Sequence, residues 1–329
     1  MSDLELPERA AITAPLPWQC DAWQSLTGLA DQGRLPHALL LTGPEGSGRQ
    51  QFASALSRYL LCQAPVQGVN CGYCKTCLLS QADTHGDWRW LGPVGQGKRI
   101  GVEQIREAIS FGARTSALGQ FKVMLIHPAD AMTTAAANAF LKCLEEPAKH
   151  TLILLIARAA SAVSATIRSR CQQTTLPAPD AQTAQSWLED LCSDPVLAAR
   201  ALKAANGMPL RAQDLLRRED ALARAEKHQV LLEALVTGRA EPGDIDGMLA
   251  AMDAEEAVRS LLATLHGYLR TLSSKQLRGP GARALLKLDE RLNNLLRALL
   301  GGATPQKELL AATLAAQLSE AFGSTAGEC

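Results

Sequence analysis

Residues 37–50 of this chain read His-Ala-Leu-Leu-Leu-Thr-Gly-Pro-Glu-Gly-Ser-Gly-Arg-Gln. The largely apolar residues 37–42 predict a short strand of the kind that is buried in a parallel sheet. The glycine-rich residues 43–48 predict a tight loop, and the pattern from Arg49 to about Cys62 predicts a helix. The simplest interpretation is a buried strand that enters a helix through a loop.

Two later apolar runs, residues 122–126 and 151–156, predict further strands. A long helix is expected between them, from about Thr133 to Glu146, because Pro147 would interrupt the backbone hydrogen bonds of a longer one. Strands that alternate with helices predict an α/β fold with a parallel sheet.

The rest of the chain has a different sequence pattern. Pro177 and Pro179 suggest a linker, and from Ala181 onward every segment has helical periodicity without a strand candidate. Gly207 and Pro209 break this helical region into a small piece and a larger one. We therefore expect three domains: an α/β domain at residues 1–177, a small helical domain at 178–217 and a larger helical domain at 218–329.

The composition indicates a soluble globular protein. The 329 residues are 47% apolar and 20% charged, and 33 Lys and Arg balance 33 Asp and Glu. A neutral chain has no global basic field for nucleic acid or anionic lipid. The N-terminus carries acids instead of the apolar core of a signal peptide, and no apolar run approaches the length of a membrane span. We expect a cytoplasmic location.

The loop at residues 43–48 has the glycine spacing of a phosphate-binding loop (P-loop) between a strand and a helix. The backbone N–H groups of such a loop can hold phosphates at a helix N-terminus. The candidate nucleotide-binding residues are Gly43, Gly46, Gly48 and Arg49. Hydrolytic loops of this type continue with Lys and then Ser or Thr, whose hydroxyl holds Mg²⁺, but here Arg49 and Gln50 stand in those places.

The second strand carries a matching departure. A hydrolytic P-loop protein ends this strand with a carboxylate for Mg²⁺, but Ile126 is followed by His127 and Pro128, and Asp130 comes two residues late. We expect a P-loop scaffold with impaired or no ATP hydrolysis. The alternatives are a divergent active ATPase that uses Arg49 and Asp130, or an unrelated tight turn. The sequence leaves open whether the loop holds nucleotide without hydrolysing it.

Four of the nine cysteines, Cys62, Cys71, Cys74 and Cys77, crowd into sixteen residues. Four thiolates with this spacing are typical of one closed, structural Zn²⁺ site. An iron–sulfur cluster takes the same ligands, and free surface thiols are the third alternative. A zinc ribbon can also bind DNA, but the charges around this one are mixed. Since four thiolates already close the site, His85 is expected to be a solvated loop residue.

Ser169, Arg170 and Cys171 follow the third strand. Among P-loop oligomers, an arginine at this place can enter a neighbour's ATP site and stabilise charge on the transferred phosphoryl group. Taken alone, the tripeptide carries little information and favours a structural arginine that caps a carbonyl or pairs with a carboxylate.

Residues 136–147 read Ala-Ala-Asn-Ala-Phe-Leu-Lys-Cys-Leu-Glu-Glu-Pro. Together with the altered P-loop, the four cysteines and the Ser-Arg-Cys tripeptide at 169–171, this string resembles the clamp-loader branch of the AAA+ proteins. The departures at residues 49–50 and 127–128 separate the chain from the ATPase subunits of that branch. The specific motifs span about residues 35–211, and the C-terminal third matches only by length and helical texture.

The resemblance implies a fold, a role and partners. The fold is an AAA+ P-loop domain with a zinc-binding insertion at residues 62–77, followed by a helical lid and an all-α collar domain. The role is that of a subunit without enzymatic activity of its own in the clamp loader of the DNA polymerase III holoenzyme, which places a sliding clamp on primed DNA. The partners are gamma/tau-type ATPase subunits and a delta subunit in a five-membered ring.

By the same resemblance, Arg170 would be an arginine finger that completes an adjacent subunit's ATP site, with Ser169 and Cys171 as its motif. Arg211 lies where active relatives carry a sensor arginine. The other sensor position, near Arg158, lacks the small polar residue of the ATPase subunits, which again points to a subunit that does not hydrolyse ATP.

Overall fold

The computed structural model describes residues 11–94, 99–118, 121–218, 220–236, 254–271, 273, 279–300, 305–306, 309–310, 312–314 and 316. The chain forms two compact units. The first comprises Met1–Leu191 with Met208–Leu210, and the second comprises Cys192–Gly207 with Arg211–Cys329. The three-domain division at residues 177 and 217 stays a prediction.

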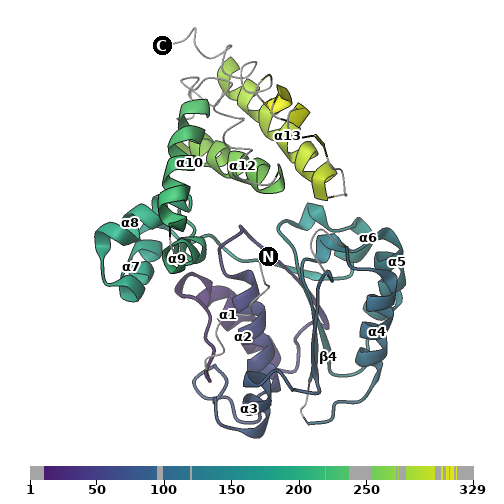
Figure 1. Ribbon diagram of the computed structural model, residues 1–329. Helices are drawn as coiled ribbons and strands as arrows, with labels where there is room; N and C mark the ends of the chain where they lie inside the picture. Colours follow the sequence, from purple (N-terminus) through teal and green to yellow (C-terminus); the bar gives the residue numbers. More distant parts are fainter. Residues whose placement is uncertain are drawn as a thin grey trace. The chain divides into compact units, whose positions relative to one another are not determined.

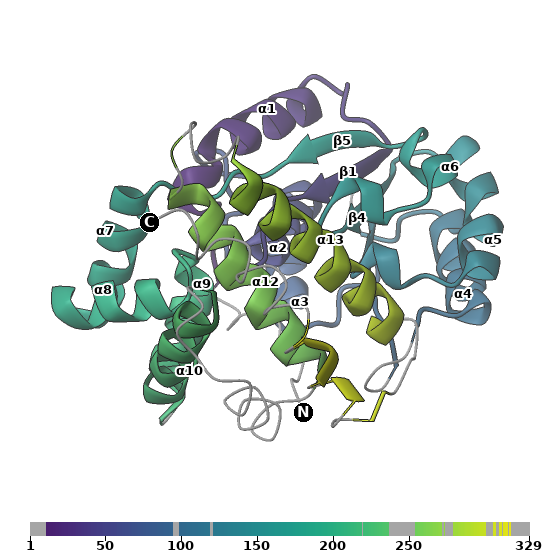
Figure 2. The same cartoon turned by 90° about the horizontal axis from the view of Figure 1, so that it is seen from above.

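The first unit is built on a parallel sheet (Figure 1) with strand order β2-β3-β4-β1-β5. The strands are β1 (Ala38–Thr42), β2 (Trp88–Leu91), β3 (Lys122–Ile126), β4 (Thr151–Ile156) and β5 (Gln172–Thr175). Figure 2 shows β5, β1 and β4 next to one another, with Leu39 of β1 paired to Leu154 of β4 and to Gln172 of β5. The predicted α/β fold with a parallel sheet is confirmed.

Helices cover both faces of this sheet, with α1 and α2 on one face and α4 and α5 on the other (Figure 1). The helical elements of the first unit are η1 (Pro17–Gln19), α1 (Cys20–Asp31), α2 (Arg49–Leu61), α3 (Lys75–Gln81), α4 (Val102–Ala113), η2 (Ala129–Ala131), α5 (Thr134–Glu145), η3 (Ala160–Ala162), α6 (Ala165–Arg168) and α7 (Ala181–Cys192). The predicted helices after the P-loop and before Pro147 are therefore α2 and α5.

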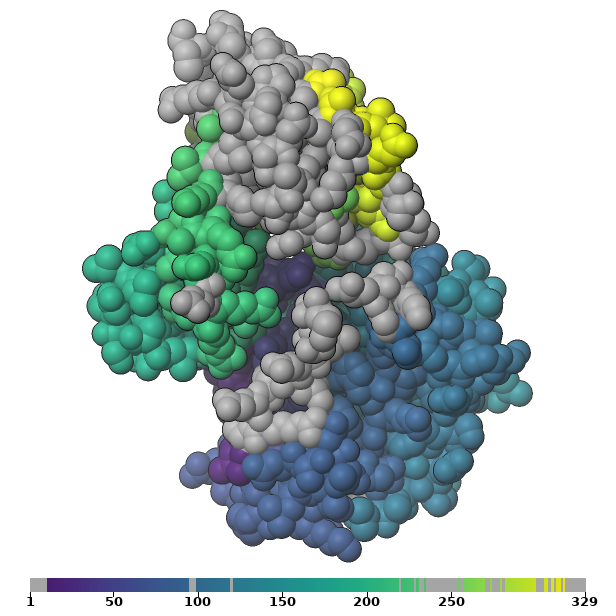
Figure 3. Space-filling view, viewed as in Figure 1, coloured from purple at the N-terminus to yellow at the C-terminus, as the bar shows by residue number. Residues whose placement is uncertain are grey.

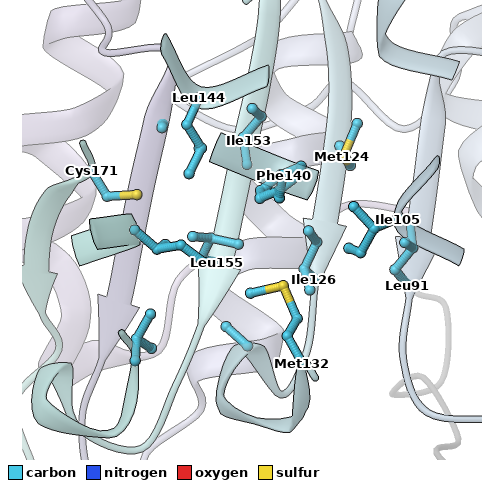
Figure 4. Packing of buried hydrophobic residues seen from close by; sticks show 14 of the residues in the cluster. Leu91, Ile105, Met124, Ile126, Met132, Phe140, Leu144, Ile153, Leu155 and Cys171 are labelled. Atoms are coloured by element: carbon cyan, nitrogen blue, oxygen red, sulfur yellow. The ribbon is translucent and has the colours of Figure 1, made fainter. Parts of the chain in front are cut away.

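The two layers of the core follow from the alternation of side chains along each strand. Leu39 and Leu41 of β1 pack with α1 and α2, whereas Leu40 packs with α4 and α5. Figure 4 shows the second layer, in which Phe140 and Leu144 of α5 lie over β4. Each central strand is apolar on both faces, which is why β1, β3 and β4 read as largely continuous apolar runs.

The two strands that the sequence did not predict, β2 and β5, lie at the edges of the sheet. β5 is polar, and its side chains are mostly exposed, so no apolar run marks it. It forms because its backbone pairs with β1 over Leu39 to Thr42. β2 has only four residues, and Trp88 and Trp90 alternate with Arg89.

The second unit is helical throughout its described residues, as predicted for the C-terminal part. Its helices are α8 (Pro195–Ala204), α9 (Pro209–Arg217), α10 (Ala221–Val236), α12 (Ala254–Thr271) and α13 (Pro280–Leu300). Its core is a leucine cluster in which Leu261 and Leu265 of α12 pack with Leu288 and Leu292 of α13. None of the described helices is long and apolar enough to cross a membrane.

Candidate functional site

The P-loop lies between β1 and α2, as the sequence predicts. Gly43, Gly46 and Gly48 all have positive φ angles, of 152°, 81° and 89°. A Cβ atom on Gly43 would lie 2.6 Å from the carbonyl oxygen of Leu176. These positions therefore require glycine for backbone conformation and for close approach, as a phosphate-binding loop does.

Residues of the N-terminal segment hold the P-loop in place through hydrogen bonds. The carbonyl oxygen of Ser47 accepts hydrogen bonds from Trp18 Nε1 at 2.8 Å and from Gln19 Nε2 at 2.9 Å. Gln19 is fully buried, and its Oε1 accepts a hydrogen bond from the backbone N–H of Leu16. The backbone N–H of Ser47 donates back to the carbonyl oxygen of Pro44. Sequence reasoning missed Gln19 because a lone glutamine before a helix carries no signal.

The two residues that differ from those of a hydrolytic site, Gln50 and His127, contact each other. Gln50 occupies the place of the Mg²⁺-binding hydroxyl, and His127 follows β3 in place of the carboxylate. The amide nitrogen of Gln50 lies 2.8 Å from His127 Nδ1. Burial, reinforced by the positive charge of Arg49, lowers the pKa of His127 to about 4. His127 is therefore neutral at pH 7, so a ring nitrogen can accept the amide proton.

Asp130, the acid that would serve a divergent ATPase, lies in η2 beyond Pro128. Its Oδ1 is buried and has no hydrogen-bond partner among the described residues. Ser80 Oγ and His85 Nε2 in the same unit share this property, so it does not single out Asp130.

The four cysteines converge as predicted. Cys62 directly follows α2, Cys74 precedes α3 and Cys77 lies within α3. All four Sγ atoms lie within 4.8 Å of one another. The Cys62–Cys74 and Cys71–Cys77 sulfur distances are both 3.9 Å. A tetrahedral site with Zn–S bonds of about 2.3 Å has sulfur–sulfur distances of about 3.8 Å. The donor set and its spacing therefore fit one Zn²⁺ ion.

The thiolate is the metal-binding form of cysteine. Burial raises the pKa values of the Cys62 and Cys77 thiols despite the hydrogen bonds that their sulfurs receive, whereas at Cys74 the hydrogen bonds dominate. The backbone N–H of Cys71 points to Cys62 Sγ at 3.3 Å, and that of Cys74 to Cys71 Sγ at 3.4 Å. Burial opposes ionisation of Cys74, but hydrogen bonds from Thr76 and the backbone outweigh it and lower the pKa of this thiol to about 6.

Asn70 joins the cysteine cluster to the start of the described chain. Its Nδ2 donates to the carbonyl oxygen of Ala11 at 2.8 Å and contacts Cys77 Sγ at 3.5 Å. Gly72 lies close to Ile12 of the N-terminal segment, since a Cβ atom on Gly72 would be 2.9 Å from Ile12 Cγ1. In Figure 3 the purple N-terminal residues lie against the blue surface of this segment. Sequence reasoning missed Asn70, since nothing in its spacing distinguishes it from a loop asparagine.

The expectation that His85 is solvated is wrong. Its side chain is 4% exposed, and its Nδ1 accepts the backbone N–H of Asp87 at 3.0 Å. Burial lowers the pKa of His85. Asp87 is fully buried and accepts hydrogen bonds from Ser116 Oγ and the backbone N–H groups of Ala117 and Leu118. His85 thus belongs to the support of the loop before β3.

The Ser-Arg-Cys tripeptide lies between α6 and β5, and its three side chains do different things. Ser169 Oγ donates to the carbonyl oxygen of Thr166, which closes the end of α6. Cys171 is buried beside Leu144 and Ile153 (Figure 4), and burial raises the pKa of its thiol to about 11. Arg170, between them, is directed to the surface, with its side chain 34% exposed.

Arg170 has a carboxylate partner, which was one of the two interpretations open from the tripeptide alone. Its Nε and Nη2 both donate to Glu145 Oε1, at 2.8 Å and 2.5 Å. Its Nη1 donates to the carbonyl oxygen of Thr166 at 2.9 Å. Sequence reasoning missed Glu145 as a partner. Arg211, the possible sensor, is an exposed residue of α9 in the second unit.

Comparison with known proteins places this geometry in a family. The sequence model of a family described as "DNA polymerase III, delta subunit" matches residues 18–180. The chain is 43% identical to DNA polymerase III subunit delta' of Pseudomonas aeruginosa over 201 residues, which cover 60% of each chain. It is 35% identical to subunit delta' of Escherichia coli over 307 residues, which cover 89% of each chain.

The fold comparison agrees. A crystal structure of a DNA polymerase III gamma subunit-related protein from Thermotoga maritima superposes with a TM-score of 0.51 at 18% identity. The superposition covers 92% of this chain and 98% of the Thermotoga chain, and it shows a shared fold. The predicted architecture, a parallel α/β domain followed by a helical C-terminal part, is thereby confirmed. With 35% identity across nearly nine-tenths of the Escherichia coli protein, the chain belongs to the family of DNA polymerase III delta' subunits.

Proposed function

We propose that this protein is a non-hydrolysing subunit of the DNA polymerase III clamp loader and that Arg170 completes the ATP site of a neighbouring gamma/tau-type subunit. In this role the ring, which also contains a delta subunit, uses ATP to place a sliding clamp on primed DNA. The names of its delta' relatives and its motifs support the assignment.

The observation that carries the proposal is the placement of Arg170 and the P-loop at opposite ends of one strand pair. β1 and β5 run parallel, with Leu39 level with Gln172 and Thr42 level with Thr175. The P-loop follows Thr42, whereas Arg170 precedes Gln172. Residues 172–175 span about 10 Å, and Arg170 lies two residues farther away. An arginine there cannot reach its own P-loop, so a finger in this place serves another subunit.

The hydrogen bond between Gln50 and His127 supports the absence of hydrolysis. Mg²⁺ takes oxygen ligands, usually carboxylates, hydroxyls, waters and phosphates. An amide nitrogen and a neutral imidazole that bond to each other offer no anionic ligand at the place where the metal would bridge the phosphates.

Zn²⁺ is the metal that we propose for the cysteine cluster, in a structural role. Cys62, Cys71, Cys74 and Cys77 would be its four ligands, and a site closed by four thiolates has no open position for catalysis. Bound zinc would fix α3 against the end of α2 and so stabilise the insertion.

The test is the DNA- and clamp-stimulated ATPase rate of the reconstituted ring with wild-type chain, Arg170→Ala and the control Arg168→Ala. Loss of an arginine finger lowers the rate of a P-loop enzyme about 10³-fold or more, but one site among several gives a smaller fall in the bulk rate. We expect a clear fall for Arg170→Ala alone, with assembly of all three rings verified by gel filtration. An unchanged rate for Arg170→Ala would contradict the proposal.

A further inference from the structure

Glu145 is the last residue of α5, where a carboxylate is electrostatically unfavourable. The C-terminus of a helix carries a partial negative charge, so basic residues are preferred there. Glu145 is nonetheless placed there and is half-exposed, with 49% of its side chain accessible. The guanidinium of Arg170 offsets this charge through two hydrogen bonds to Glu145 Oε1.

We propose that Glu145 is the positioning residue of Arg170, an inference that rests on the proposed function. A free arginine side chain has many rotamers, and holding one of them costs conformational entropy before any contact with phosphate is made. The contact with Glu145 fixes the Nε edge of the guanidinium, and the carbonyl oxygen of Thr166 fixes Nη1. The finger is thus ordered before the neighbouring ATP arrives.

Glu145 can perform this task because the end of α5 is rigidly held. Leu144, the preceding residue, is 1% exposed and packs in the core layer between α5 and the sheet (Figure 4). Its carbonyl oxygen lies 2.9 Å from Nε2 of His37, the residue that precedes β1. A carboxylate on a helix end fixed at two points is a more precise support than one on a free loop.

The count of donors distinguishes a positioned finger from a blocked one. A guanidinium has five N–H groups. Of those on Arg170, one on Nε and one on Nη2 bond to Glu145, and the two on Nη1 face Thr166 O and Ser169 Oγ. The second N–H of Nη2 has no partner among the described residues. A phosphate oxygen can therefore be contacted without breaking the pair with Glu145.

The experiment is a double-mutant cycle in the reconstituted ring. Glu145→Ala is expected to lower turnover at the ATP site that Arg170 completes about two- to fivefold, the size typical of an exposed ion pair. The bulk rate of the ring should therefore fall less than with Arg170→Ala, with the KM for ATP unchanged. In the Arg170→Ala background the same substitution is expected to have no further effect. Glu145→Gln keeps the side-chain shape and one acceptor oxygen, so it should recover part of the rate. Glu146→Ala removes the adjacent exposed carboxylate and is the matched control, with a wild-type rate.

The outcomes separate this inference from the proposed function. If Arg170→Ala lowers the ATPase rate and Glu145→Ala does not, the role of Arg170 as an arginine finger is supported and the positioning role of Glu145 is overturned. A fall for Glu145→Ala that persists in the Arg170→Ala background, or a rate that rises, also overturns it. If Arg170→Ala leaves the rate unchanged, the proposed function itself fails.

Discussion

Asn70 Oδ1 accepts two hydrogen bonds from Thr13, one from its backbone N–H at 2.8 Å and one from its hydroxyl at 2.9 Å. Asn70 is fully buried, and its amide nitrogen contacts a sulfur of the cysteine cluster. One side chain therefore links the cysteine cluster to a stretch more than fifty residues earlier. The stability of the two regions should be coupled through it.

Replacement of Asn70 by alanine tests this coupling. We expect Asn70→Ala to lower the free energy of unfolding by about 1–3 kcal/mol, because Thr13 and Ala11 lose their buried partner. Zinc should also be lost faster to a chelator, which a colorimetric competition assay measures. Gln63→Ala removes an exposed amide beside Cys62 and should change neither quantity. Equal zinc release from both variants would contradict the coupling.

Chelation tests the metal itself. Removing the metal should release about one Zn²⁺ per chain and lower the melting temperature, because metal binding to such a site is folding free energy. Elemental analysis gives the identity and the ratio, and calorimetry gives the melting temperature. Iron together with visible absorbance would instead identify an iron–sulfur cluster. Cys192→Ser, which leaves the cluster intact, is the control for thiol content.

The substitution Arg49→Lys should not turn the isolated chain into an ATPase. It restores the expected P-loop lysine, but Gln50 and His127 still occupy the places of the Mg²⁺ ligands. Phosphate release in the presence of Mg²⁺ and ATP is the measurement. Gly48→Trp introduces a bulky side chain into the loop and is the control for contamination. Hydrolysis by a contaminating enzyme would not change with this substitution. Robust hydrolysis by Arg49→Lys that is lost with Gly48→Trp would refute this interpretation of His127.

The stability of the protein should fall in mild acid because of His127. Its pKa is about 4 in the folded chain, against about 6.5 in an unfolded one, so between these values only the unfolded chain takes up the proton. Stability is therefore fully present above about pH 6.5 and is lost as the pH falls towards 4, by about 3 kcal/mol. Urea unfolding at about pH 7 and about pH 4.5 measures this loss.

The loss should be smaller in His127→Asn, which lacks the titrating ring, and unchanged in His150→Asn. His150 is exposed and has a positive φ angle of 60°, a conformation that asparagine tolerates, so the control should fold normally. The same acid sensitivity in wild type and His127→Asn would show that His127 is not its source.

The central strands could be predicted from sequence because burial on both faces leaves a continuous apolar run. The runs at residues 122–126 and 151–156 match β3 and β4 at both ends. β5 could not be found in this way, since only backbone pairing with β1 holds its polar residues in place. The four cysteines were recognised because they lie close together in the sequence, and the fold brings their Sγ atoms within 4.8 Å of one another.

The partners of the site residues could not be predicted, because they come from distant segments. Nothing near Arg170 in the sequence indicates Glu145, which lies 25 residues earlier and meets it only because α5 ends beside α6. The burial of His85 was missed for the same reason. His85 bonds to the backbone of Asp87, whose carboxylate binds Ser116, and the sequence does not reveal this contact between distant residues. Residue types predicted the chemistry, whereas the fold determined the contacts.

The opposite ends of the β1–β5 pair also separate two groups of residues that can change independently. Substitutions at the P-loop end, where Gln50 contacts His127, need not disturb Arg170, because the length of the sheet lies between them. Under the proposed function, a subunit of this kind can lack nucleotide chemistry of its own and still serve a neighbour's. Division of labour within a ring therefore requires no new fold, only independent drift at one edge of an inherited one.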